Sequence, residues 1–76
     1  MNQARRKLIG CVRDRLSDAA SSISRAKDEE ETCLQNTPES FEGTDRYQDM
    51  EDAVDSLEDA LASIQEACAY LDNILG

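Results

Sequence analysis

The stretch "YQDMEDAVDSLEDALASIQEACAYLDNIL", Tyr47 to Leu75, decides the fold of this chain. Steps of three and four residues alternate along it and always reach an apolar or amphipathic side chain, as in a helix that packs against other helices. A second apolar row beside this heptad seam widens the stripe. The seam is Tyr47, Met50, Val54, Leu57, Leu61, Ile64, Cys68, Leu71 and Leu75, and the second row is Ala53, Ala60, Ala67 and Ile74.

The first half of the chain carries a similar seam with one polar interruption. Seven of its eight positions are apolar, and Glu30 is the exception. The positions are Ile9, Val12, Leu16, Ala19, Ile23, Ala26, Glu30 and Cys33. High charge and few aromatic residues would by themselves suggest disorder, but two sustained heptad patterns argue for two helices.

The segment between the two seams predicts a break. It reads "QNTPESFEGTDRY". Pro38 cannot continue a helix and restricts Thr37 to extended backbone, and Thr37 is a candidate cap for a short turn that begins at Pro38. Gly43 can end that turn, and Thr44 is well placed as the N-cap of the helix that follows.

These features predict an all-α chain with a single domain over residues 1–76. We expect an antiparallel two-helix hairpin with helices at about 3–35 and 45–75 and a loop at 36–44. The numbers of facing residues should then add to about 80. Two helices cannot cover the wide stripe on the second one, so we also expect a homodimer in the form of a four-helix bundle. The predicted core and self-association seam consists of Ile9, Val12, Leu16, Ile23, Met50, Val54, Leu57, Leu61, Ile64 and Leu71.

Charge is divided unevenly along the chain. Eight Lys and Arg stand against 17 Asp and Glu, a net charge of -9 at pH 7. This balance argues against a general nucleic-acid binder, because such proteins need clustered cations. Residues 1–27 carry seven basic and two acidic side chains, whereas residues 28–76 carry one basic and 15 acidic side chains. An antiparallel dimer would place each basic end beside the partner's acidic end, so we expect that arrangement.

The acidic residues around the loop form the candidate surface for another partner, an unidentified basic protein. The set is Glu29, Glu31, Glu42, Asp45, Asp49, Glu51 and Asp52. Solubility alone also explains such charge, since most carboxylates on a helical hairpin simply face solvent. An acidic rod can also occupy a site built for nucleic acid, because its carboxylates present a field like that of phosphates.

The residue types needed for catalysis are missing. The chain has no His, no Cys-x-x-C pair and no phosphate-binding glycine loop. A thin hairpin also offers its carboxylates no pocket that would raise one pKa for acid–base work. We therefore expect no enzyme, no catalytic residue, no metal ligand and no cofactor.

Several residues on or beside the seams raise questions of pairing. With facing numbers that add to about 80, Cys11 should lie roughly level with Cys68, and a disulfide between them is conceivable. A cytoplasmic setting would keep both thiols reduced. Glu30 either reaches solvent or pairs with Arg46 across the hairpin.

The segment "RRKLIGC", Arg5 to Cys11, looks like the end of a bacterial lipoprotein signal. Such a signal needs roughly 7–15 apolar residues before its cleavage site, and here the basic run is followed almost at once by the cysteine. No stretch approaches the roughly 18 apolar residues of a membrane span. We expect a cytoplasmic protein with no membrane partner.

The segment from Asn36 to Leu71, about half the chain, resembles small acidic helical-hairpin proteins of bacterial genomes, phages and other mobile elements, which are largely uncharacterised. The shared features are the Asn36-x-Pro38-Glu39 turn, Phe41, Gly43-Thr44, Arg46-Tyr47 and the acidic-aliphatic helix after them. The resemblance implies the hairpin fold and a phage or mobile-element origin, and it implies no catalytic residue.

Two functions remain open at this point. The first is a non-enzymatic protein–protein interaction module, in the form of a phage or mobile-element inhibitor that binds a host anti-phage defence protein through its acidic helical surface. Nucleic-acid mimicry is a special form of this function. The second is a structural or scaffolding coiled-coil subunit that self-assembles and inhibits nothing. In neither function does the chain bind nucleic acid directly.

Overall fold

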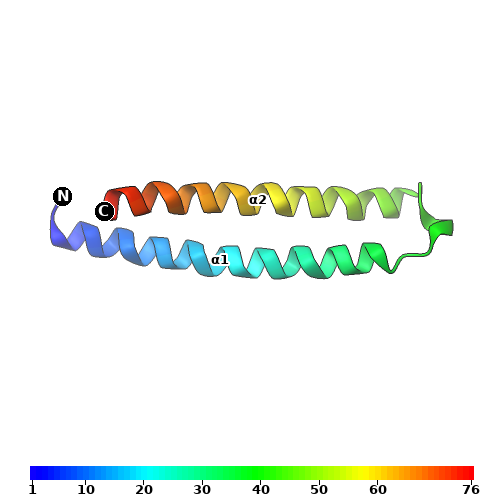
Figure 1. Ribbon diagram of the computed structural model, residues 1–76, viewed down its shortest axis with the longest axis horizontal. Coiled ribbons are helices and arrows are strands. Elements are labelled where there is room, and N and C mark those ends of the chain that lie inside the picture. The colour runs from blue at the N-terminus through cyan, green and yellow to red at the C-terminus, as the bar shows by residue number, and fades with distance from the viewer.

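Two long antiparallel helices joined by a short connection make up the computed structural model, which describes residues 1–76. Helix α1 is Gln3–Gln35, the 3-10 turn η1 is Glu39–Phe41, and helix α2 is Asp45–Leu75. Figure 1 shows α1 and α2 side by side, with both termini at one end of the rod and the connection at the other. We call the end with the termini the open end and the end with the connection the loop end. The predicted all-α helical hairpin is confirmed.

Polar side chains cap the start of each helix. The Asn2 side chain accepts a hydrogen bond of 2.8 Å from the backbone N–H of Arg5, and the Thr44 hydroxyl accepts one of 3.2 Å from the N–H of Tyr47. Each bond satisfies a backbone donor that has no partner within its helix. The predicted cap at Thr44 is therefore confirmed, and the cap at Asn2 was not foreseen.

Two residues shape the connection between the helices: Thr37 at the end of α1 and Gly43 before α2. The Thr37 hydroxyl donates to the carbonyl of Cys33 at 2.9 Å, so it closes the end of α1. The prediction that Thr37 caps η1 is wrong, because Pro38 occupies that cap position and no side chain bonds there. Gly43 has φ +83°, which a residue with a Cβ adopts only with strain, and this residue lets the chain enter α2.

The hairpin is a rod of 59 × 15 × 14 Å. Its radius of gyration is 17.3 Å, whereas a compact chain of this length would have about 11 Å. Only Val54 is buried, at 7% exposure, out of 76 residues. The side chains between the helices are otherwise half-buried, because two helices can cover each other from one side only.

The seam of α2 lies against α1 as the heptad pattern predicts. Val54 is buried, and the other eight seam positions are half-buried. Of the second row, Ala53 and Ala67 are half-buried, while Ala60 and Ile74 are exposed. The widened stripe therefore extends beyond what α1 covers.

The seam of α1 is rotated from the predicted one. Ile9, Leu16, Ala19, Ile23 and Glu30 are half-buried as expected, but Val12 is 39% exposed, so it lies outside the interface between α1 and α2. Ala26 and Cys33 are exposed as well. The half-buried row of α1 reads Arg6, Ile9, Arg13, Leu16, Ala20, Ile23, Lys27, Glu30 and Leu34. Long Arg and Lys stems can cover apolar surface while their charged ends reach outward, which explains how cations stand in this row.

The two sides of the seam differ in chemistry. In an antiparallel pair, equivalent heptad positions of the two helices lie on the same side of the seam. One side, the polar flank, carries Ser17 and Ser24 of α1 with Glu58, Gln65 and Asp72 of α2. The other side, the apolar flank, carries Leu8, Val12, Ala19, Ala26 and Cys33 of α1 with Ala53, Ala60, Ala67, Tyr70 and Ile74 of α2.

Candidate protein-interaction surfaces

An ion pair joins the two helices near the open end. Arg13 Nε lies 2.7 Å from Asp72 Oδ1, and a terminal guanidinium nitrogen lies 3.1 Å from Oδ2. The hydrogen bond from Arg13 lowers the pKa of Asp72 from its ordinary value of 3.8. The same bond raises the pKa of Arg13. This two-pronged pair fixes the direction of both side chains as well as holding opposite charges together.

Two more cations of α1 reach across to α2. Lys27 Nζ lies 3.7 Å from a carboxylate oxygen of Glu58. The guanidinium of Arg6 donates to the carbonyls of Ile74 and Leu75. Those carbonyls, at the end of α2, accept no backbone hydrogen bond within the helix. A cation beside them also interacts favourably with the negative end of the helix dipole. The cations in the α1 seam thus bind the carboxylates and the C-terminal end of α2.

The polar flank contains a shallow open groove of about 480 Å³. It is lined by Arg13, Ser17, Ala20, Ser21, Ser24, Leu61, Gln65, Cys68, Ala69 and Asp72. Ser17 and Ser24 stand one heptad apart, which is the signal in the sequence that could have revealed this polar side. Its polar groups and the adjoining ion pairs would have to lose water if another helix covered them.

The three cysteines are all free. Cys11 lies midway between the seam residues Ile9 and Arg13, so it projects from the side of α1 opposite to α2. Cys68 is half-buried on the seam. The disulfide between Cys11 and Cys68 that the sequence leaves open is not formed, and the direction of Cys11 around α1 turns its thiol away from the seam.

Glu30 and Arg46 do not form an ion pair, since the two pairs in the structure are Arg13–Asp72 and Lys27–Glu58. Glu30 is half-buried on the seam and Arg46 is exposed. Of the two alternatives for Glu30, the pairing with Arg46 is excluded.

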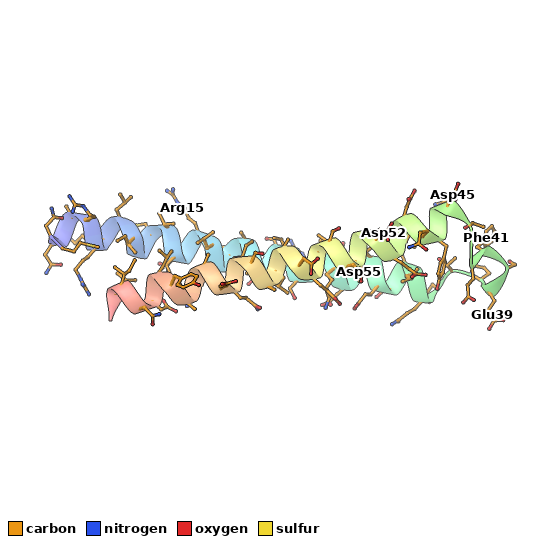
Figure 2. All side chains as sticks on the ribbon, turned by 90° about the horizontal axis from the view of Figure 1, so that it is seen from above. Arg15, Glu39, Phe41, Asp45, Asp52 and Asp55 are labelled. Atoms are coloured by element: carbon orange, nitrogen blue, oxygen red, sulfur yellow. The ribbon has the colours of Figure 1, made fainter.

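The predicted acidic surface gathers at the loop end. Glu29, Glu42, Asp45, Asp49 and Asp52 are exposed. The other two, Glu31 and Glu51, are half-buried on the polar side of the seam. None of the seven forms an ion pair. Figure 2 shows Asp45 and Asp52 in this half of the rod, with Glu39 nearby.

The carboxylates of this surface act on the pKa of one neighbour, Tyr47. Burial raises the pKa of Tyr47, and the charges of Glu42 and Glu51 raise it further. Asp52 is exposed and accepts a hydrogen bond of 2.9 Å from the Gln48 side chain. Concentrated, unpaired and exposed carboxylates can attract a basic surface on another protein.

A hollow of about 340 Å³ lies beside this acidic surface. Its apolar wall consists of Cys33, Phe41, Tyr47 and Met50, and its polar lining includes Thr37 and Arg46. Phe41 remains 53% exposed, so it covers the end of the helices only in part. The hollow therefore adds an apolar spot to a charged end.

No cluster of three or more His, Cys, Asp or Glu side chains has the arrangement of a metal site. Neither helix has an apolar stretch of the length that a bilayer crossing needs. No family model matches the chain, and no curated protein or solved structure shows significant similarity to it.

Proposed function

We propose that the chain is a non-enzymatic protein–protein interaction module, which forms a coiled-coil four-helix bundle with a second copy and offers its acidic loop end to a basic protein. One observation carries this proposal: Val54 is the only buried residue of 76. The accessible surface is 5629 Å², whereas a compact monomer of 8.4 kDa would expose about 4,600 Å².

The free energy of folding explains why this exposure favours a partner. Ordering the backbone costs about 1–2 kcal/mol per residue, and apolar burial is the main term that offsets this cost. A hairpin with a single buried side chain has little of that term. Small helical units with few buried residues commonly gain the rest by association.

The charge of the molecule supports a basic partner. Only Asp72 and Glu58, of 17 acidic residues, take part in ion pairs. The resemblance to hairpin proteins of phages and mobile elements suggests an inhibitor that blocks a host anti-phage defence protein in the bacterial cytoplasm. A defence protein with a nucleic-acid site would meet carboxylates where it normally meets phosphates.

Affinity capture from a bacterial lysate with two matched variants tests this function. Asp45→Asn, Asp49→Asn and Asp52→Asn together remove three charges from the loop end. Asp14→Asn, Asp18→Asn and Asp59→Asn remove three exposed charges elsewhere. We expect a stoichiometric basic protein with the wild type and the second variant, and its loss with the first. Competition by duplex DNA or RNA would identify mimicry, and equal capture by both variants would refute a role for the acidic surface.

A structural subunit is the second candidate, and the alanine row on α2 favours it. Ala53, Ala60 and Ala67 recur every seven residues, and Ala60 extends the stripe beyond the surface that α1 covers. A chain that only self-assembles would need this row and no acidic binding surface. Recovery of the chain alone from the lysate would favour this function.

A further inference from the structure

We propose that the second copy packs on the apolar flank, and that it runs antiparallel, so that large side chains near the open end of each copy pack on small ones near the loop end of the other. This inference rests on the proposed self-association and adds the face, the direction and the contacts. It is independent of the proposed binding of a basic protein.

The exposed large apolar side chains of the two helices all lie on this flank. Leu8 is 63% exposed, Tyr70 62% and Ile74 43%, and Val12 belongs to the same group. Leu8 and Val12 stand four residues apart on one side of α1, as Tyr70 and Ile74 do on α2. Both pairs are close to the open end (Figure 1). An apolar patch of this kind on a short hairpin marks an interaction site.

From its middle to the loop end, the same flank carries small side chains, and the exposed Arg46 ends the row on α2. Ala60 lies at the middle of α2, and Ala26, Cys33 and Ala53 lie nearer the loop. Small residues let a neighbouring helix approach closely, and interdigitation of large with small side chains fills a helical core well. An antiparallel copy brings the large patch over the small one at both ends. A parallel copy would stack the large patches on each other and leave the alanines apart.

Charge at the edge of the flank favours the same direction. Arg15 and Glu29 lie on the outer side of the flank on α1, at equal distances from Ser22 near the middle of the rod. An antiparallel copy therefore places Arg15 of one chain level with Glu29 of the other. Figure 2 shows Arg15 in the half that holds the termini, and Asp45 and Asp52 in the opposite half. Both side chains are exposed, and neither has an ion-pair partner within the hairpin.

The polar flank does not suit this role. Arg13–Asp72 and Lys27–Glu58 reach across it, and Ser17 and Ser24 line its groove. Covering those groups would remove their water without supplying partners. The apolar flank carries no ion pair and no hydrogen-bonded side-chain pair except Tyr70 with Glu66, whose contact lies at its edge.

The size of the flank matches the area that a stable interface needs. One long side of the rod, 59 Å by 15 Å, offers roughly the 800 Å² per partner that standard interfaces bury. The excess of accessible surface over a compact monomer is about 1,000 Å². A single copy on one flank therefore accounts for the surface that the hairpin leaves open.

Two alanines of α2 provide a matched test of the face. Ala60 lies on the apolar flank and Ala62 on the outer surface, and both are exposed in the hairpin. Ala60→Glu and Ala62→Glu add the same charge to the same helix, so the hairpin alone should tolerate both alike. Sedimentation equilibrium over a series of concentrations, with helicity from circular dichroism, measures the association of each.

We expect the wild type and Ala62→Glu to dimerise with dissociation constants within about threefold, and Ala60→Glu to bind at least about tenfold more weakly, because an unpaired charge would be buried twice. If Ala60→Glu lost helix while Ala62→Glu kept it, this result would also support the inference. The two variants differ only in whether the added charge blocks the second copy, so the lost helix would depend on that copy. A monomeric wild type, or equal dimers in both variants, would overturn it. Loss of the basic partner in the lysate experiment would leave these results unchanged.

A charge exchange tests the direction. In the antiparallel dimer, Arg15→Glu sets two carboxylates opposite each other at both ends, and we expect the dimer to weaken about fivefold. The double variant Arg15→Glu with Glu29→Arg should restore wild-type association. In a parallel dimer each residue is level with its own copy, so Arg15 and Glu29 would not meet and neither variant would change the affinity by way of this pair. An unchanged Arg15→Glu dimer, or a double variant that fails to recover, would overturn the antiparallel arrangement.

Discussion

Arg13 and Asp72, 59 positions apart in the sequence, are joined by two parallel hydrogen bonds of 2.7 and 3.1 Å. The arginine stands in the seam of α1, and the aspartate stands beside the seam of α2. Because both ends of this contact are directional, it distinguishes one register of the hairpin from a slip by one turn. The pair thus specifies alignment more than it adds stability, since exposed ion pairs contribute little.

A double-mutant cycle tests this ion pair. Arg13→Met keeps the apolar stem and removes the charge, and Asp72→Asn keeps the shape of the side chain. We expect each single change to lower the midpoint of thermal unfolding slightly, and the two effects to be less than additive. Fully additive effects would show that the two side chains do not interact in solution.

The same pair should respond to acid. The pKa of Asp72 is lowered in the folded chain by its bond to Arg13, so its contribution is fully present above the unfolded value of about 3.8. That contribution is lost as the pH falls through the lower, folded pKa. The difference in stability between wild type and Asp72→Asn, followed by circular dichroism, should therefore shrink only in strong acid. A difference that already disappears at neutral pH would contradict this assignment.

Tyr47 should respond to alkali. Burial and the charges of Glu42 and Glu51 raise its pKa above the ordinary value of 10.0. A raised pKa means that stability is present below pH 10.0 and is lost as the pH rises through the folded pKa. In a Tyr70→Phe background, where Tyr47 is the sole tyrosine, absorbance should show late ionisation together with loss of helix. Tyr47→Phe should keep its helicity further into alkali than that background does.

Replacing each of two glycines with alanine should change the free energy of unfolding in opposite directions. Gly43 has φ +83° and open space around its Cα, so Gly43→Ala should cost about 1 kcal/mol through backbone strain alone. Gly10 lies within α1, and a Cβ there would meet nothing within 4 Å. Gly10→Ala should therefore stabilise by about 1 kcal/mol through helix propensity. Urea unfolding measures both, and shifts of the same sign would contradict the conformation of the connection.

Val54 should be the most sensitive position of the seam. It is the single buried residue, at 7% exposure. Val54→Ala removes two methyl groups that pack against neighbouring side chains. We expect a loss of about 2 kcal/mol in the free energy of unfolding. A loss below about 0.5 kcal/mol, the range of ordinary surface changes, would show that Val54 does not lie in the core.

The sequence predicts the hairpin and the seam of α2 because the local signals agree. Pro38 and Gly43 stop one helix, Thr44 starts the next, and every seam position of α2 is apolar or amphipathic. In α1 the same reasoning chose Val12 where the structure uses Arg13. A pattern of apolar and polar letters treats arginine as a surface residue, although its stem packs well and its charge has a partner on α2.

The structure forms neither of the two pairings that the sequence leaves open, Cys11 with Cys68 and Glu30 with Arg46. A constant sum of facing numbers places Cys11 at a height along the rod, but it says nothing of the direction in which Cys11 projects. Direction depends on which row of α1 faces α2, and that row was assigned one position away. The acidic surface needed no such detail, because exposed carboxylates of residues close in sequence gather at the loop end wherever the seam runs.

Both ends of the chain leave the rod at the same place, where Arg6 binds the carbonyl of Leu75 (Figure 1). A protein fused to either end is therefore held at one pole, clear of the acidic pole. In the proposed antiparallel bundle, the fusions carried by the two copies would stand at opposite poles, about the 59 Å length of the rod apart. Dimerisation would thus fix the distance between two proteins that are fused to the two copies.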